Sequence, residues 1–252
     1  MKHEYRLGLV SVSFRQHTPK EIAAAVKDAG LSYIEWGSDI HAPKDDEARL
    51  LEIAALDEEY GLICSSYGTY FTLGETPIEE LSQYISAAKT LKTNVLRLWC
   101  GSKSRRDMTQ AEEARLLEEC RLAAALAEAE GVTLCMECHV QSYTEHLEDA
   151  LSLMKEIHSP HFRMYWQPFQ WQSKEQNLAY AEAVFPYVHH VHVFQWKDKS
   201  RFPLQSGISE WQGYLEKLPA PRTLLLEFMP DNRIESLKTE ADSLRTIIGV
   251  EK

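Results

Sequence analysis

The stretch Thr18–Trp36, TPKEIAAAVKDAGLSYIEW, contains the unit from which the fold of this chain follows. Thr18 and Glu21 have the spacing of a capping box, and Pro19 stands at the first helical position, where its missing N–H costs nothing. Gly30 is the residue type that most readily ends a helix in a left-handed conformation. The β-rich run SYIEW follows directly. The stretch therefore predicts a helix that ends at a glycine and passes at once into a strand.

The same order of helix and strand recurs along the whole chain. Capping-box patterns return at Thr76, Thr109 and Ser173, and Gly61 and Gly131 stand where helices should end. The β-rich runs are RLGLVSVSF (6–14), SYIEW (32–36), LICSS (62–66), NVLRLWC (94–100), VTLCMEC (132–138), FRMYW (162–166), HHVHVFQ (189–195) and RTLLLEF (222–228). Strict alternation implies parallel strands joined by crossover helices, and eight such units close most simply into a (β/α)8 TIM barrel.

An open doubly wound sheet is the competing fold. It would normally place a Gly-rich phosphate turn after the first strand, and the segment VSFRQHTPKE (12–21) contains no G-x-G-x-x-G. No internal repeat, low-complexity segment or linker divides the sequence. We therefore expect one domain over residues 1–252.

Composition restricts the class of function. The 252 residues are 44% hydrophobic and 26% charged, which predicts an ordinary packed core, and the net charge of −11 argues against a nucleic-acid surface. The stretch LGLVSVSF (7–14) is too short to span a membrane and lacks a signal-peptide cleavage pattern. We expect a cytoplasmic protein with a small-molecule partner and no membrane partner, and assembly of several copies stays open.

The five cysteines are an odd number and widely spread, which suits a reducing compartment. Cys135 and Cys138 have C-x-x-C spacing, but the period of a strand directs them to opposite faces. We expect them to be buried free thiols.

Polar residues gather at the predicted C-terminal ends of the strands, where barrel enzymes carry their chemistry. Glu137 and Glu227 each end an apolar strand, and His192 lies in HHVHVF, one layer nearer the mouth than His190. Buried carboxylates are costly unless they are paired or bound to metal. Two glutamates and a histidine at one mouth therefore predict a divalent ion, such as Mn, Mg, Co or Zn.

Aromatic and amide side chains accompany this cluster. Flat apolar rings beside hydrogen-bonding groups suit the faces and hydroxyls of a sugar or another polyol. The alternative for any single ring is that it only packs a loop onto the barrel rim. The predicted substrate contacts are Trp36, His41, Tyr67, Trp99, His139, Gln170, Trp171, Gln195 and Trp196.

The chain resembles the xylose-isomerase-like barrels, and within them the sugar (phosphate) isomerase/epimerase family, over essentially its full length. Glu137 in MECH, His192 in HHVHVF and Glu227 in LLLEF match the family's motifs. The resemblance implies one divalent metal ion, held through Glu, Asp, His and Glu, with Gln167 standing at the Asp position. It implies that Glu137 and Glu227 move a proton next to the substrate carbonyl, and that Arg201 contacts the substrate.

The sequence departs from the family pattern at three positions. Gln167 and Gln170 replace the Asp and His of Asp-x-x-His, and Gln195 replaces the Asp of His-x-x-Asp. A glutamine carbonyl can still bind a hard cation, but as a dipole and not as a charge. We expect weaker metal binding, or a substrate that supplies the missing anion.

The functional prediction is a metal-dependent sugar isomerase or epimerase. A lyase or dehydratase acting on a keto-sugar or keto-polyol is the alternative within the family. A non-catalytic sugar-binding barrel with a degraded metal site is the alternative from another class. A metal-dependent endonuclease of the apurinic-site type is disfavoured by the acidic charge.

Overall fold

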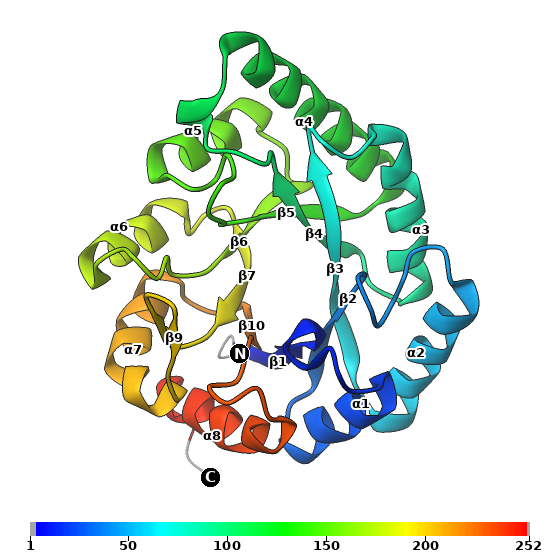
Figure 1. Cartoon of the computed structure of the whole chain (residues 1–252), viewed down its shortest axis with the longest axis vertical. Coiled ribbons are helices and arrows are strands. Elements are labelled where there is room, and N and C mark those ends of the chain that lie inside the picture. The colour runs from blue at the N-terminus through cyan, green and yellow to red at the C-terminus, as the bar shows by residue number, and fades with distance from the viewer. Residues whose placement is uncertain (1–3, 251–252) are drawn as a thin grey trace.

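Eight parallel strands form a closed barrel in the computed structural model, which describes residues 4–250. Neighbouring strands follow the order β1-β10-β7-β6-β5-β4-β3-β2, and helices surround them (Figure 1). The barrel strands are β1 (Arg6–Val10), β2 (Tyr33–Gly37), β3 (Ile63–Leu73), β4 (Val95–Cys100), β5 (Thr133–Glu137), β6 (Phe162–Trp166), β7 (Val188–Val193) and β10 (Thr223–Leu226). The predicted single-domain (β/α)8 TIM barrel is confirmed.

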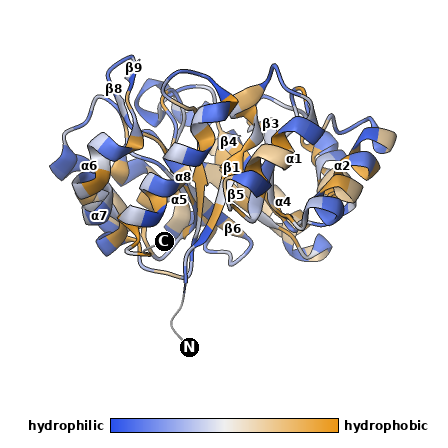
Figure 2. Ribbon diagram, turned by 90° about the horizontal axis from the view of Figure 1, so that it is seen from below, coloured by the Kyte–Doolittle hydropathy of each residue, from blue (hydrophilic) through white to orange (hydrophobic). Residues whose placement is uncertain are grey.

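The helices form the outer layer, with polar surfaces toward solvent and the apolar strands at the centre (Figure 2). They are α1 (Pro19–Asp28), α2 (Glu47–Tyr60), α3 (Leu81–Thr90), α4 (Gln110–Glu130), α5 (Leu147–Ile157), α6 (Lys174–Val184), α7 (Ile208–Lys217) and α8 (Leu237–Ile247). Capping boxes form at Thr18, Thr109 and Ser173, as predicted. Gly61 and Gly131 end α2 and α4 at φ +66° and +68°, where a side chain would be strained.

The predicted capping box at Thr76 is wrong. Thr76 Oγ1 accepts a hydrogen bond from the backbone N–H of Thr72 at 3.1 Å, so it serves a turn and not a helix end. The chain then passes through Pro77 into a short 3₁₀ helix, Ile78–Glu80, and α3 begins only at Leu81.

Two strands, β1 and β3, differ most in length from the sequence prediction, and both differences fall at the C-terminal end of the barrel. β1 stops at Val10, and a 3₁₀ helix, Ser11–Phe14, follows it. There Ser11 Oγ accepts a hydrogen bond from the N–H of Gly37 at 2.9 Å. β3 instead continues to Leu73, with an irregular register between Gly68 and Thr72. At this end of the barrel, the 3₁₀ helix after β1 therefore contacts the end of β2.

The apolar core has two parts. The larger part lies between strands and helices, and a smaller cluster lies inside the barrel. Cys135 belongs to the inner cluster and Cys138 to the outer core, so the predicted opposite faces are confirmed. All five cysteines are free and buried. Among residues 4–250, no helix is long and apolar enough to cross a membrane.

Candidate active site

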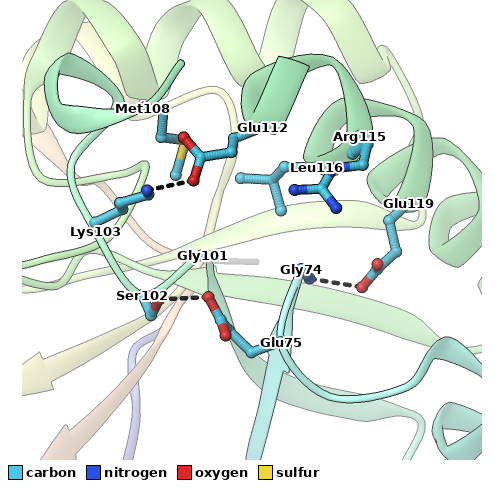
Figure 3. A pocket seen from close by; sticks show the side chains of 10 residues that line it. All are labelled: Gly74, Glu75, Gly101, Ser102, Lys103, Met108, Glu112, Arg115, Leu116 and Glu119. Carbon is cyan, nitrogen blue, oxygen red and sulfur yellow. Dashed lines mark hydrogen bonds and ion pairs between the residues drawn. The ribbon is translucent and has the colours of Figure 1, made fainter. Parts of the chain in front are cut away.

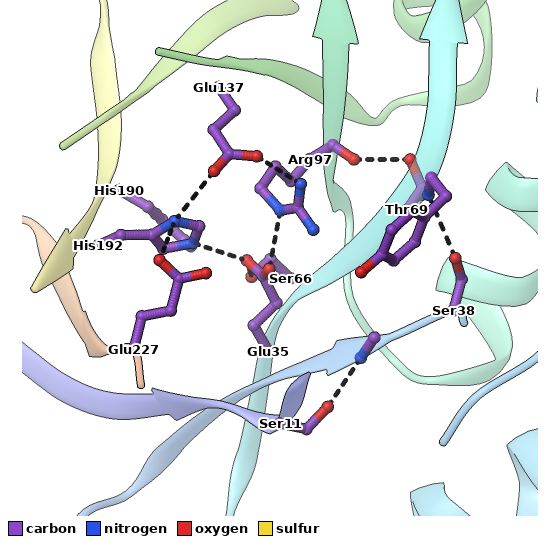
Figure 4. Close-up of polar contacts among 12 residues, drawn as sticks. Ser11, Glu35, Ser38, Ser66, Thr69, Arg97, Glu137, His190, His192 and Glu227 are labelled. Atoms are coloured by element: carbon purple, nitrogen blue, oxygen red, sulfur yellow. Dashed lines mark hydrogen bonds and ion pairs between the residues drawn. The ribbon is translucent and has the colours of Figure 1, made fainter. Parts of the chain in front are cut away.

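Three side chains predicted to hold metal converge inside the barrel mouth (Figure 4). Glu137 ends β5, His192 lies on β7 and Glu227 directly follows β10. Nδ1 of His192 lies 3.6 Å from a carboxylate oxygen of Glu137 and 3.5 Å from one of Glu227. One donor atom from each residue lies within 4.8 Å of the others. Ligand atoms about 2.1 Å from one ion lie roughly 3.0 to 3.6 Å apart, so this donor set fits a divalent ion.

Gln167 directs its carbonyl oxygen to the same point. Its Nε2 donates to the backbone carbonyl of Cys138 at 3.0 Å, which leaves Oε1 3.1 Å from Nδ1 of His192. The amide orientation follows from this bond, because a carbonyl oxygen could not occupy the donor position. Gln167 therefore presents an oxygen beside the two carboxylates.

A buried arginine joins two carboxylates beneath the mouth. Arg97 on β4 donates through Nε to Glu35 at 3.0 Å and through Nη1 to Glu137 at 2.6 Å. Glu35 and Arg97 meet across β3 above Gly68. A Cβ on Gly68 would lie 2.5 Å from Glu35 Oε1 and 3.2 Å from Arg97 Nη2, so a larger residue would separate the pair. Glycine at this position is therefore required by a close approach of side chains.

Arg97 keeps both of its carboxylate partners ionised. Burial raises the pKa of Glu35, but the Arg97 guanidinium and His192 outweigh burial and lower it to about 2. Burial likewise raises the pKa of Glu137, and Arg97 outweighs it, so that this pKa lies well below its ordinary value. Glu137 also accepts a hydrogen bond from Trp99 Nε1 at 2.6 Å. Glu137 is thus a fixed anion.

Glu227 and His192 respond to the same surroundings in a different way. Burial raises the pKa of Glu227, and the attraction of His192 does not reverse this. Burial lowers the pKa of His192, but Glu227, Glu137 and Glu35 outweigh it and raise the pKa to about 10. Glu227 therefore retains a proton more readily than Glu137 does, so the two glutamates are chemically unequal.

A cavity of about 170 Å³ opens above this cluster. Since a cavity of about 150 Å³ can hold benzene, the space suits one six-membered ring. His139 packs on Trp99 with ring centroids 5.4 Å apart, and its Nδ1 is 2.7 Å from the carbonyl of Val140. Nδ1 must be the donor in that bond, so Nε2 is the ring nitrogen left for other contacts. The lining residues are Val12, Arg15, Tyr70, Arg97, Trp99, Glu137, His139, Gln167, Gln170, Phe194, Trp196, Glu227 and Phe228.

Three predicted substrate contacts do not reach this cavity. Trp36 is fully buried on the helix side of β2, where its Nε1 donates to Asp57 at 3.1 Å. Tyr67 is also fully buried, and its hydroxyl donates to the carbonyl of Ala42. Both residues point outward because side chains alternate along a strand. His41 is held in the loop after β2 by Ser11 Oγ, 3.0 Å from its Nδ1.

Five further predicted contacts lie at or beyond the edge of the mouth. Trp196 and Gln170 line the mouth cavity and also a neighbouring cavity, whereas Trp171 and Gln195 line only the neighbouring one. Arg201, in the hairpin of β8 (Trp196–Lys197) and β9 (Ser200–Arg201), places its guanidinium carbon 4.6 Å from the ring centroid of Trp196. The sequence therefore identified this loop region but not its division into two spaces.

Arg97 is a site residue that the sequence predictions do not include. The signal was present in NVLRLWC (94–100), where one charge interrupts an apolar parallel strand. Such a charge must be paired when buried. Arg97 and Trp99 also share strand parity, so they face the same side.

A separate hollow of about 150 Å³ lies outside the barrel, between the ends of β3 and β4 and helix α4 (Figure 3). Its carboxylates already have partners. Glu119 accepts from the N–H of Gly74 at 2.6 Å, and Glu112 pairs with Lys103 at 2.6 Å. These bonds tie two loops to α4 and place no group in the mouth.

Comparisons with known proteins agree with this architecture. The 3-dehydroshikimate dehydratase of Bacillus anthracis is 24% identical over 119 residues, which are 47% of this chain and 42% of that protein's length. The crystal structure of the probable 3-DHS dehydratase AsbF from Bacillus anthracis has a TM-score of 0.82 at 18% identity, covering 95% of this chain and 98% of that one. D-psicose 3-epimerase from Clostridium cellulolyticum H10 has a TM-score of 0.72 at 14% identity, covering 97% and 99%.

At 18% and 14% sequence identity, the two structural similarities show a shared fold and no more. The family model for the xylose isomerase-like TIM barrel matches residues 23–247, which is most of the chain. The chain therefore belongs to the xylose isomerase-like TIM barrel family.

Proposed function

We propose that this protein is a metal-dependent enzyme that moves a proton at the carbon next to the carbonyl of a small hydroxylated substrate. The observation that carries the proposal is the convergence of Glu137, His192 and Glu227, whose donor atoms lie within 4.8 Å of one another below a ring-sized cavity. A divalent ion in this set would act as a Lewis acid on the substrate carbonyl and make the adjacent C–H more acidic. Glu137, Gln167, His192 and Glu227 are the proposed ligands.

The inequality of the two glutamates suggests their roles. Glu137 is fixed as an anion by Arg97 and Trp99, which suits it to binding a cation. Glu227 lines the same cavity, and among residues 4–250 neither Arg97 nor Trp99 hydrogen-bonds to it, which suits it better than Glu137 to accepting a proton. Arg97 lines the cavity, and its Nη2 has no acceptor among residues 4–250. This nitrogen is available to hold an anionic oxygen of the substrate.

The reaction proposed first is isomerisation or epimerisation of a sugar-like carbonyl compound. Proton removal by one group and return by another requires two groups around one carbon. Glu137 and Glu227 come from β5 and β10, which β6 and β7 separate in the barrel, so they flank the cavity from different directions. The hydrogen bonds that hold Glu137 favour Glu227 as the group that removes the proton.

Dehydration of a hydroxylated keto compound is the second candidate. It needs a base for the C–H proton and an acid for the departing hydroxyl. His139 lines the same cavity as Glu227, and its Nδ1 is engaged with Val140, so its Nε2 and the Glu227 carboxyl are the proposed pair of groups. The similarity to a 3-dehydroshikimate dehydratase supports this candidate.

The test is to incubate the Mn-loaded protein in deuterated water with D-psicose, D-tagatose or 3-dehydroshikimate. Incorporation of deuterium at the carbon next to the carbonyl supports isomerisation or epimerisation. Loss of water from the substrate, measured by the change in its absorbance, supports dehydration. Glu227→Gln should lower either rate by about 10²-fold or more. The exposed Glu235→Gln is the matched control. Turnover of any of these compounds at the full rate by Glu227→Gln would contradict the proposed role.

Metal binding has its own readout. Added Mn should raise the melting temperature of the wild type, and Glu137→Ala should abolish that increase because it removes one anionic ligand. An increase that survives Glu137→Ala would place the metal elsewhere.

A further inference from the structure

A second cavity, of about 490 Å³, lies beside the mouth. It is bounded by the connection after β6, residues 167–173, and by the connection after β7 that carries the β8–β9 hairpin. Gln170, Phe194 and Trp196 line both cavities, so the two spaces adjoin at these side chains. We call this space the rim cavity. None of the proposed metal ligands lines it.

Aromatic rings form much of its wall. Trp171 is 51% exposed, and its ring packs on Phe169 with centroids 5.1 Å apart. The ring centroids of Trp196 and Phe194 lie 5.5 Å apart. The guanidinium carbon of Arg201 lies 4.6 Å from the ring centroid of Trp196. A large exposed indole at the edge of a cavity is apolar surface that a flat ligand would remove from water.

The wall is held in place without a ligand. Asn177 is buried, and its side chain donates to the carbonyl of Phe169 at 3.0 Å and accepts from its N–H at 2.8 Å. These two bonds fix the connection that carries Gln170 and Trp171. A pre-formed cavity of this kind is typical of small-molecule sites, because little ordering is needed on binding.

The rim cavity is lined by four amide side chains and by four charged ones, and these charges cancel. Gln195 packs against Gly207, where a Cβ would lie 2.1 Å from its Oε1, and its Nε2 lies 3.4 Å from Glu210. The charged residues on the wall are Lys174, Lys197, Asp198 and Glu210. Two positive and two negative groups offer no net attraction for an ion, whereas amides donate to and accept from hydroxyl groups.

We propose that the rim cavity is a second binding subsite, which takes an uncharged hydroxylated ring. The mouth has room for about one six-membered ring. A substrate that fills both spaces therefore carries one ring at the metal centre and a second ring, linked to it, against Trp171 and Trp196. This inference rests on the proposed function for the first ring, and on the lining of the rim cavity for the second.

Titration calorimetry on the full chain, without metal and without turnover, tests the proposal. The probes are glucose and four disaccharides of different linkage: maltose, cellobiose, lactose and sucrose. At least one disaccharide should bind tenfold or more tightly than glucose. Trp171→Ala should bring that ratio close to one and leave glucose affinity unchanged. Leu122→Ala, at a residue that is 53% exposed on α4, should keep the wild-type ratio.

Either of two results overturns the proposal: no disaccharide binds more tightly than glucose, or Trp171→Ala leaves the ratio unchanged. Because Trp171 is half exposed, its truncation removes little packing, and an unchanged circular dichroism spectrum confirms that the variant is folded. The proposed function fails separately. If Mn does not bind but the disaccharide preference depends on Trp171, only the metal-dependent function is wrong. If Mn binds and the preference is absent, only the rim subsite is wrong.

Discussion

Two carboxylates are buried on opposite sides of β2, and their pKa values are shifted in opposite directions. Glu35 points into the barrel, and the next residue, Trp36, points outward to Asp57 on α2. Inside, Glu35 meets the Arg97 guanidinium and accepts a hydrogen bond from Ser66 at 3.0 Å. Outside, the Asp57 carboxylate has Trp36 Nε1 as its hydrogen-bond donor.

The partners decide the protonation of each group. Burial raises the pKa of Asp57 to about 7, since one indole N–H offsets little of the desolvation. The same burial acts on Glu35, but a full positive charge outweighs it and lowers the pKa to about 2. Burial alone therefore does not predict the charge of a carboxylate. A buried carboxyl group whose partner is a neutral donor can keep its proton, whereas a nearby guanidinium stabilises the ionised carboxylate.

Loss of the positive charge inside the barrel should have the largest effect. Arg97→Met would leave Glu35 and Glu137 buried without their cation, and we expect it to lower the free energy of unfolding by about 3 to 5 kcal/mol at pH 7. Urea denaturation measures this. Arg121 is the matched control, because it also bridges two glutamates, Glu118 and Glu156, but at the surface. Arg121→Met should cost less than about 1 kcal/mol.

A second variant separates charge from packing. If unpaired carboxylates cause the loss, adding Glu35→Gln to Arg97→Met should restore part of the stability. No restoration, together with equal losses for the two arginine variants, would mean that the buried ion pairs are no more important than the exposed ones.

Removal of the Asp57 carboxylate, outside the barrel, should raise the free energy of unfolding, whereas Arg97→Met should lower it. The pKa of Asp57 is about 7 when folded and 3.8 ordinarily, so the folded protein binds this proton more tightly. Its contribution to stability is present at low pH and is lost as the pH rises to about 7, at about 1.4 kcal/mol per pH unit between the two pKa values. Asp57→Asn should thus be more stable than the wild type at pH 8, by about 4 kcal/mol.

The measurement compares urea denaturation of the wild type and Asp57→Asn at pH 5 and pH 8. The difference between the two proteins should grow with pH. Asp28→Asn, at an exposed position, should follow the wild type at both values. If the free energy of unfolding of Asp57→Asn also changes with pH as that of the wild type does, the pKa of Asp57 is not raised in the folded protein. Asp57 and Glu35 would then both be ionised.

The smallest expected effect comes from adding a carboxylate at the mouth. Gln167→Asp would place a charge where Gln167 Oε1 now faces His192, and charge-assisted contacts are about twice as strong as neutral ones. Mn affinity should rise about tenfold, which corresponds to about 1.4 kcal/mol. Titration calorimetry with Mn decides this. Gln195→Asp, outside the mouth cavity, should leave the affinity unchanged; an equal rise in both variants would indicate a general charge effect and not a ligand at position 167.

Much of the fold was readable because its signals are local. The capping boxes at Thr18, Thr109 and Ser173 and the glycines after the helices concern residues a few positions apart. Thr76 has the same local pattern, but a turn with Thr72 uses its side chain. Strand-end placement also brought Glu137, His192 and Glu227 to the mouth, because parallel strands end on one side of a barrel.

Strand parity explains which predicted contacts missed the mouth. Trp36 stands near the end of β2 and Tyr67 in the middle of β3, and both face the helices, whereas Trp99 and Glu137 face inward. Position along a strand gives the height in the barrel, and parity gives the face. The sequence prediction used the first property and not the second for the aromatic residues.

The sequence by itself determined the order of strands and helices, the closed barrel and three polar residues of its mouth. Only the tertiary structure decided that Arg97 joins Glu35 to Glu137 over Gly68, and that Trp171 and Gln195 line a separate cavity. Arg97 and Glu35 are 62 positions apart in the chain. Periodicity and capping act over a few residues, whereas the energy of a buried charge depends on which distant side chain reaches it, and that is settled when the barrel closes.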